Sequence, residues 1–136
     1  MGAVLTVRDE SPTTGTADRS FMLEFPTERI TVRELIRERV YQEVQDYNRE
    51  RASGSGRFRG LVQPTDAEVL LNGEFKVRGG REVDWKQQFE KACEAFENSR
   101  VLVLVGDRQA ASLDEVIEIA PGTEVTFLRL VMLVGG

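Results

Sequence analysis

The fold of this chain is first indicated by one stretch, residues 30–49, which reads ITVRELIRERVYQEVQDYNR. Thr31 stands three residues before Glu34, which is the spacing of a capping box at the start of a helix. Ile30 and Leu35 flank that box at the positions of a hydrophobic staple. The stretch therefore predicts a helix that begins directly after Thr31.

The same stretch separates apolar from charged side chains along the expected helix. The apolar side chains recur at helical spacing and are Val32, Leu35, Ile36, Val40, Val44 and Tyr47. The opposite, polar face is assigned Arg33, Arg37, Glu38, Glu43 and Asp46. The pattern predicts an amphipathic helix from Val32 to Arg49.

Two strands are expected before this helix. Apolar and polar residues alternate from Ala3 to Val7 and again from Phe21 to Phe25, which is typical of half-buried strands. The segment Asp9–Ser20 between them is predicted to be a polar loop. Because that loop holds no helix, the two strands are most simply paired antiparallel.

The middle of the chain predicts a linker and then a hairpin. Ala52–Gly60 is rich in Gly, Ser and Arg, so we expect a flexible linker, with Arg57-Phe58-Arg59 as part of a solvated loop. Glu68–Val77 has an Asn72-Gly73 dipeptide between two apolar runs. That dipeptide favours a tight two-residue hairpin turn.

A second helix is expected after the hairpin. Asp84 is its predicted cap, with Gln87 at the reciprocal position of a capping box. Its apolar face comprises Trp85, Phe89, Ala92 and Phe96. Cys93 borders that face, where we expect a small packing residue rather than a catalytic thiol.

The last part of the chain predicts two strands with a short helical turn between them. Val101–Val105 is a continuous apolar run, suited to a buried strand. Ser112–Glu115 has capping-box spacing and predicts the helical turn. Its expected apolar side chains are Leu113, Val116 and Ile119. Pro121-Gly122 marks a turn before a long apolar strand, Val125–Val134, and the sequence then ends in Gly135-Gly136.

This order of elements resembles a β-grasp, and the segment from Arg100 to Gly136 resembles the second half of ubiquitin. The likeness implies an α+β fold, a β-grasp (ubiquitin-like) mixed sheet crossed by a helix, with a hairpin-and-helix insertion. It implies one domain over residues 1–136, with the insertion at about 51–99. The closest group is the bacterial ubiquitin-like modifiers encoded beside their own conjugation enzymes, which are tied to phage defence or stress.

The resemblance implies that the chain is a substrate of other enzymes and is not itself an enzyme. An E1-like activating enzyme would adenylate the carboxylate of Gly136. An E2-like conjugating enzyme would then attach the chain, through its Gly135-Gly136 terminus, to a target protein. A deconjugating protease would reverse the step. Ubiquitin has an arginine before its diglycine, whereas this tail has Met132, Leu133 and Val134. Its activating enzyme is therefore expected to have an apolar groove.

Two other functions fit the same sequence. Pro121–Leu128 followed by a diglycine also resembles the sulfur carriers of molybdopterin and thiamin synthesis, which form a carboxyl-terminal thiocarboxylate. Alternatively the chain is a scaffold that forms a homo-oligomer without carboxyl-terminal chemistry. The assembly surface would then include Phe75, Trp85, Phe89 and Phe96.

Amine acceptors for self-conjugation are few, namely Lys76, Lys86 and Lys91.

Composition narrows the function classes further. The chain of 136 residues has no histidine, so the usual triads and the commonest metal ligand are missing, and we expect no metal and no cofactor. The net charge of −5 argues against nucleic acid as a partner. A single cysteine, no apolar run of membrane-spanning length and no signal peptide predict a cytoplasmic protein without a membrane partner.

Overall fold

The computed structural model describes residues 2–11, 19–51, 57–70 and 74–130, which form an α+β fold with a mixed sheet and two helices. The elements in chain order are β1 (Ala3–Glu10), β2 (Arg19–Phe25), β3 (Arg29–Thr31), α1 (Val32–Glu50), β4 (Arg57–Phe58), β5 (Ala67–Val69), β6 (Phe75–Val77), the 3₁₀ helix η1 (Arg78–Gly80), α2 (Trp85–Glu97), β7 (Val101–Val105), β8 (Arg108–Gln109), β9 (Val116–Glu118) and β10 (Glu124–Arg129).

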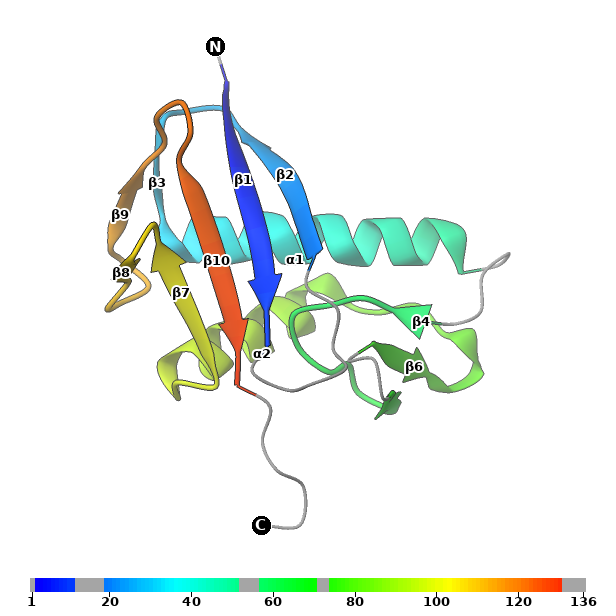
Figure 1. Ribbon diagram of the computed structural model, residues 1–136. Coiled ribbons are helices and arrows are strands. Elements are labelled where there is room, and N and C mark those ends of the chain that lie inside the picture. Colours follow the sequence, from blue (N-terminus) through cyan, green and yellow to red (C-terminus); the bar gives the residue numbers. More distant parts are fainter. Residues whose placement is uncertain (1, 12–18, 52–56, 71–73, 131–136) are drawn as a thin grey trace.

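The main sheet has the strand order β2-β1-β10-β7-β8, so the first and the last long strands lie side by side at its centre. β1 and β10 are parallel, with Val7 opposite Val125. β1 and β2 are antiparallel, which confirms the pairing predicted from the sequence. Figure 1 shows both helices on one face of this sheet, with α1 running across the strands.

β1 is longer than the sequence predicts. The expected polar loop from Asp9 to Ser20 begins too early and ends too late, because Asp9 and Arg19 still pair across the two strands. Asp9 continues the inward alternation of Leu5 and Val7 and is only 5% exposed. A charged residue in an inward position breaks the apolar pattern, and the strand therefore looks shorter in the sequence than it is.

Helix α1 confirms the predicted helix and its capping box. The Glu34 N–H donates to the Thr31 hydroxyl at 3.1 Å, and the Thr31 N–H donates to the Glu34 carboxylate at 3.4 Å. All six predicted apolar side chains are buried. Two further N–H groups of the first turn donate to carbonyls that are distant in the sequence. Val32 donates to the carbonyl of Glu115 at 3.0 Å, and Arg33 donates to that of Leu113 at 2.9 Å.

The prediction of a helical turn at Ser112–Glu115 is wrong. The segment forms a tight turn, in which the Glu115 N–H donates to the Ser112 carbonyl at 3.2 Å, and β9 follows. β9 pairs with β3, so Ile117 is buried while Val116 is 44% exposed. β-branched residues favour this strand, and the carbonyls that a helix would use cap α1 instead.

The predicted hairpin is present as β5 and β6. Val69 lies opposite Phe75, and the Leu70 N–H donates to the Glu74 carbonyl at 2.8 Å. These pairs enclose residues 71–73, one more than a two-residue turn contains. The predicted turn residues Asn72-Gly73 lie outside the described residues.

The prediction of a flexible linker over Ala52–Gly60 is wrong at Phe58. Residues 52–56 of that segment lie outside the described residues. Phe58 belongs to β4, which pairs with β6, and is 2% exposed. Its ring meets Tyr47 of α1 edge-on, with centroids 5.5 Å apart. A Cβ on Gly60 would come within 2.0 Å of the Phe58 ring, so glycine lets the ring fold over the backbone there.

Helix α2 confirms the second predicted helix in part. The Asp84 side chain caps it by accepting from the Lys86 N–H at 3.0 Å. The reciprocal contact expected from Gln87 is replaced, since its side-chain oxygen accepts from the Thr65 hydroxyl at 3.2 Å. Gln88, which carries no apolar signal, is 1% exposed and donates to the Val62 carbonyl at 3.0 Å.

Truncation of Phe58 tests whether the insertion shares the core of the sheet. Phe58→Ala is expected to lower the free energy of unfolding by about 3 to 5 kcal/mol, because a buried ring leaves a cavity between α1 and β6. Urea denaturation measures this loss. Arg57→Ala, in the same strand but exposed, serves as the control. A loss for Phe58→Ala within about 1 kcal/mol of that control would contradict the shared core.

Candidate functional site

The predicted working end, Gly135-Gly136, and the tail Met132, Leu133 and Val134 lie outside the described residues. The structure describes where the tail leaves the fold. β10 spans Glu124–Arg129, and the Leu130 N–H donates to the Arg100 carbonyl at 2.9 Å. The part of the predicted strand from residue 131 to Val134 lies outside the described residues. The tail therefore begins between the end of β1 and the start of β7.

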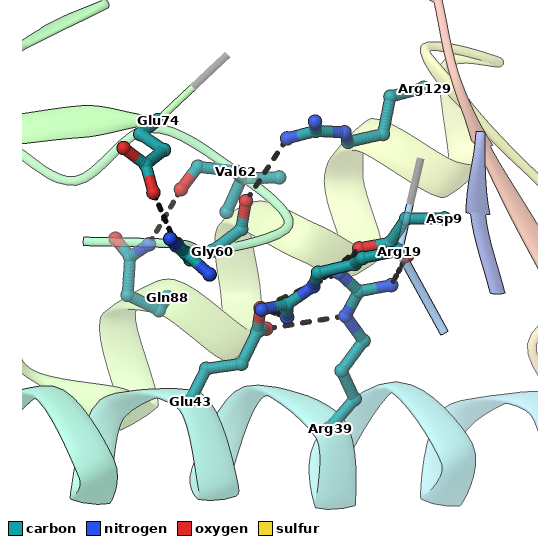
Figure 2. A network of polar contacts seen from close by, with 10 residues as sticks. Asp9, Arg19, Arg39, Glu43, Gly60, Val62, Glu74, Gln88 and Arg129 are labelled. Carbon is teal, nitrogen blue, oxygen red and sulfur yellow. Dashed lines mark hydrogen bonds and ion pairs between the residues drawn. The ribbon is translucent and has the colours of Figure 1, made fainter. Parts of the chain in front are cut away.

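A buried ion pair lies beneath this end of the sheet (Figure 2). Arg39 of α1 donates through Nη2 to Oδ2 of Asp9 at 2.6 Å and through Nη1 to Oδ1 of the same carboxylate. The side chains are 1% and 7% exposed. A two-point contact of this kind fixes both the distance and the orientation of the groups. It joins the end of β1 to the middle of α1.

Two further side chains complete a network of alternating charges. Glu43 accepts from Nε of Arg39 at 3.3 Å and from Nη2 of Arg19 at 3.4 Å. Arg19 also contacts Asp9 at 3.3 Å. The sequence assigned Glu43 to the polar face of the helix, and this is wrong, because its side chain is 6% exposed. Arg39 and Glu43 are one helical turn apart on the side that faces the sheet.

Aromatic rings lie beside the guanidinium groups of both arginines. The guanidinium of Arg39 lies 4.5 Å from the ring centre of Phe127 and 5.2 Å from that of Phe21. Arg19 lies 4.8 Å from the same Phe21 ring. The negative ring faces attract the cations. Since Phe127 belongs to β10, the network also supports the strand from which the tail leaves.

Arg129 connects the tail strand with the insertion. Its Nη1 donates to the carbonyl of Gly60 at 3.3 Å (Figure 2). Its Nε is buried and has no hydrogen-bond partner among the described residues. Burial lowers the pKa of Arg129, an effect that nearby Asp9 partly offsets. The last residue of β10 is therefore held by the loop that follows β4.

The network shifts the pKa values of Arg39 and Glu43. Burial raises the pKa of Glu43, and the attraction of Arg39 offsets this only in part. The geometry gives the reason, because Arg39 makes its short contacts to Asp9 and only longer ones to Glu43. Burial alone would lower the pKa of Arg39, but Glu43 and Asp9 together raise it.

Outside this network, most of the described carboxylates form ion pairs or hydrogen bonds that support the fold. Asp114 and Glu115, explained from the sequence by a capping box, instead pair with Arg33 and Arg108. Across the described ranges, no three potential metal-ligating side chains gather into a set that could hold an ion. Burial raises the pKa of the half-buried Cys93 thiol, which reduces its thiolate fraction.

The predicted assembly surface does not form as one exposed patch. Phe75 and Phe96 are 7% and 8% exposed and belong to the core. Trp85 and Phe89 are half-buried and pack against it, with Trp85 edge-on to Tyr41 at 5.3 Å. This placement favours the interpretation in which the insertion enlarges the core.

The three predicted acceptor lysines differ in their surroundings. Lys76 and Lys86 are exposed. Lys91 is half-buried, and its Nζ donates to the Thr65 hydroxyl at 2.8 Å and lies 3.4 Å from the Gln63 carbonyl. The amines of Lys76 and Lys86 are thus the more accessible ones.

Sequence reasoning missed Asp9 and Arg39 as the centre of the site. The sequence does indicate that Arg39 is buried, because Arg39 and Glu43 follow Ile36 at the spacing of the apolar face of α1. Two opposite charges on an apolar stripe need a buried partner. The partner, Asp9, is distant in the sequence and could be assigned only once the strands were placed.

Comparisons with models of protein families, with curated proteins and with solved structures give no match. Separately, none of the helices in the described ranges has the length and apolar character that crossing a bilayer requires.

Replacement of Glu43 by glutamine tests the electrostatics of the network. A folded-state pKa raised above the ordinary value gives stability that is present below about pH 4.5 and is lost as the pH rises through the folded-state pKa. Glutamine does not titrate. Urea denaturation over a pH series is expected to show Glu43→Gln gaining stability relative to the unsubstituted protein as the pH rises. A relative loss of stability over that window would contradict the burial of this charge.

Proposed function

We propose that the chain is a ubiquitin-like protein modifier with a β-grasp fold, whose Gly136 carboxyl group is activated and conjugated to targets. One observation carries the proposal most directly: the last strand, β10, lies at the centre of the sheet parallel to β1. The sequence then continues from it to Gly135-Gly136.

The topology supports the β-grasp assignment. The sheet has the order β2-β1-β10-β7-β8: β1 and β2 form an antiparallel pair, β10 lies beside β1, and β7 and β8 follow on its far side. Helix α1 crosses one face. A β-grasp requires this central parallel pair and this crossing helix. The segment Arg51–Ser99 is then an insertion between α1 and the third long strand, and it adds β4, β5, β6 and α2 to the fold.

The root of the tail suits presentation to another enzyme. β10 is hydrogen-bonded on both sides and rests on the Arg39 network, so the tail starts from a fixed point. Residues 131–136 can span roughly 20 Å when extended. The terminal glycines lack a Cβ and admit many backbone geometries, which suits entry into a narrow adenylation channel.

The chemistry would take place on partners. The Gly136 carboxylate attacks the α-phosphate of ATP, which releases pyrophosphate and gives an acyl-adenylate. A cysteine thiolate of the activating enzyme then displaces AMP to form a thioester. An acceptor amine attacks that thioester, releases the thiol and forms the amide.

Activation is tested with the cognate activating enzyme from the same genome and ATP. The full chain is expected to support ATP–pyrophosphate exchange and to form an adduct with the enzyme that a free thiol cleaves. A variant lacking Gly135 and Gly136 should do neither, because the carboxylate no longer reaches the nucleotide. An equal urea midpoint for both chains shows that the truncation leaves the fold intact.

The same reaction distinguishes the alternatives. Attachment of the chain through its Gly136 carbonyl to lysine amines supports the modifier. Lys76 and Lys86 should then be modified in preference to Lys91. A thiocarboxylate on Gly136, seen by mass spectrometry without any conjugate, would replace the modifier by a sulfur carrier. Absence of exchange with the full chain would contradict both functions.

A further inference from the structure

Helices α1 and α2 pack side by side on one face of the main sheet (Figure 1). They run in opposite directions. Asn48, near the end of α1, hydrogen-bonds to the backbone of Val83, just before α2 begins. The charge of Arg33, at the start of α1, partly offsets the effect of burial on the pKa of Cys93, which lies late in α2. Because α2 belongs to the insertion, the seam between the two helices exists only through the insertion.

Three side chains meet where this seam faces solvent, and we call them the Trp85 cluster. Trp85 of α2 is half-buried, and Tyr41 of α1 meets its ring edge-on, with ring centres 5.3 Å apart. Tyr41 is 36% exposed. The exposed guanidinium of Arg37, one turn before Tyr41, lies over the Trp85 ring at 5.5 Å from its centre. The fold thus holds a cation and two aromatic rings together at its surface.

The charge of Arg37 is not neutralised by the fold. None of the described carboxylates forms an ion pair or a hydrogen bond with it, and its contact is the one with the Trp85 ring. Glu34, one turn earlier, is used in the capping box, where it accepts from the N–H and the hydroxyl of Thr31. Arg33, by contrast, pairs with Asp114. A cation–π contact holds the Arg37 guanidinium in place but leaves its N–H donors available.

The aromatic members of the cluster offer further donors. The Tyr41 hydroxyl accepts from the Gln45 side chain at 3.0 Å, and its own proton has no acceptor among the described residues. The indole N–H of Trp85 likewise has no acceptor in the described ranges. Tyrosine and tryptophan combine an apolar ring with a polar group, a combination that is frequent at interfaces. A positive charge, hydrogen-bond donors and apolar rings together suit a carboxylate that is attached beside apolar groups.

We propose that the Trp85 cluster binds an acidic amphipathic helix of a partner protein. A glutamate or aspartate of that helix contacts Arg37 and Tyr41, and its apolar side chains contact Trp85 and the half-buried Phe89, one turn further along α2. The unpaired charge of Arg37 selects an acidic partner.

A helix fits this place better than an extended segment does. The backbone groups of α1 and α2 are bonded within each helix, so the seam offers no free edge to a strand. A third helix can instead lay its side chains into the groove between two packed helices. Binding here does not involve the tail and does not depend on the proposed function.

The probe is a helical peptide with blocked ends that carries leucines at positions i, i+4 and i+7 and one glutamate at i+3. The same peptide with glutamine at i+3 is the comparison. Trp85 is the only tryptophan of the chain, so its fluorescence reports on the site. The glutamate peptide should change this fluorescence and bind about tenfold more tightly than the glutamine peptide, because it makes a charge-assisted hydrogen bond. Added salt should reduce the difference.

Substitution of Arg37 locates the site, with affinities measured by calorimetry. Arg37→Gln is expected to weaken binding of the glutamate peptide about tenfold and to leave the glutamine peptide nearly unchanged. Arg37→Lys keeps the charge but loses the planar fork, so its affinity should lie between the two. Arg49→Gln removes the same charge from a position of α1 that is 70% exposed, and it should leave binding unchanged. Equal urea midpoints show that the variants fold alike.

Equal binding of the two peptides would overturn the proposal, and so would equal weakening by Arg37→Gln and Arg49→Gln. Heat of binding without a change in Trp85 fluorescence would place the peptide elsewhere on the protein and overturn it too. The same holds if neither peptide binds, or if sedimentation shows that a second copy of the chain covers the seam. Should Arg37→Gln fail to fold, the comparison of the two peptides on the unsubstituted protein still decides.

Discussion

The buried guanidinium of Arg39 constrains the whole arrangement of helix and sheet. A buried cation without partners costs several kcal/mol, so the fold holds together only where Asp9 and Glu43 reach it at the same time. Asp9 fixes the end of β1, Glu43 fixes the turn of α1, and the ring of Phe127 places β10 against the same group. Sliding α1 by one turn would break all three contacts and leave the guanidinium buried without a partner.

The network also supports β10, the last described strand, at the centre of the sheet. β10 lies between β1 and β7, and its final residue, Arg129, reaches back to the Gly60 carbonyl of the insertion. The insertion is in turn anchored by Phe58 against Tyr47. The segment between α1 and β7 is thus a second support for the end of the sheet, in addition to the enlargement of the core.

The sequence predicts the elements that rest on local signals. The capping box at Thr31, the alternation from Phe21 to Phe25 and the cap at Asp84 are short-range features, and the structure confirms them. The errors arise where a distant partner decides. Ser112–Glu115 has helix-capping residues, but its carbonyls serve the first turn of α1. Phe58 lies in a Gly-rich segment, yet β6 makes it a strand residue. The candidate diglycine depends on sequence alone, because the structure does not describe it.

The central claim, that Arg39 and Asp9 act as one unit, is tested by a double-mutant cycle of Asp9→Asn and Arg39→Met followed by urea denaturation. Each single variant is expected to lose about 3 to 5 kcal/mol of unfolding free energy, because it leaves the partner charge buried. The double variant should lose less than the sum of the two by about 1 to 3 kcal/mol. Losses that add within about 0.5 kcal/mol would show that the two side chains are independent and would contradict the claim.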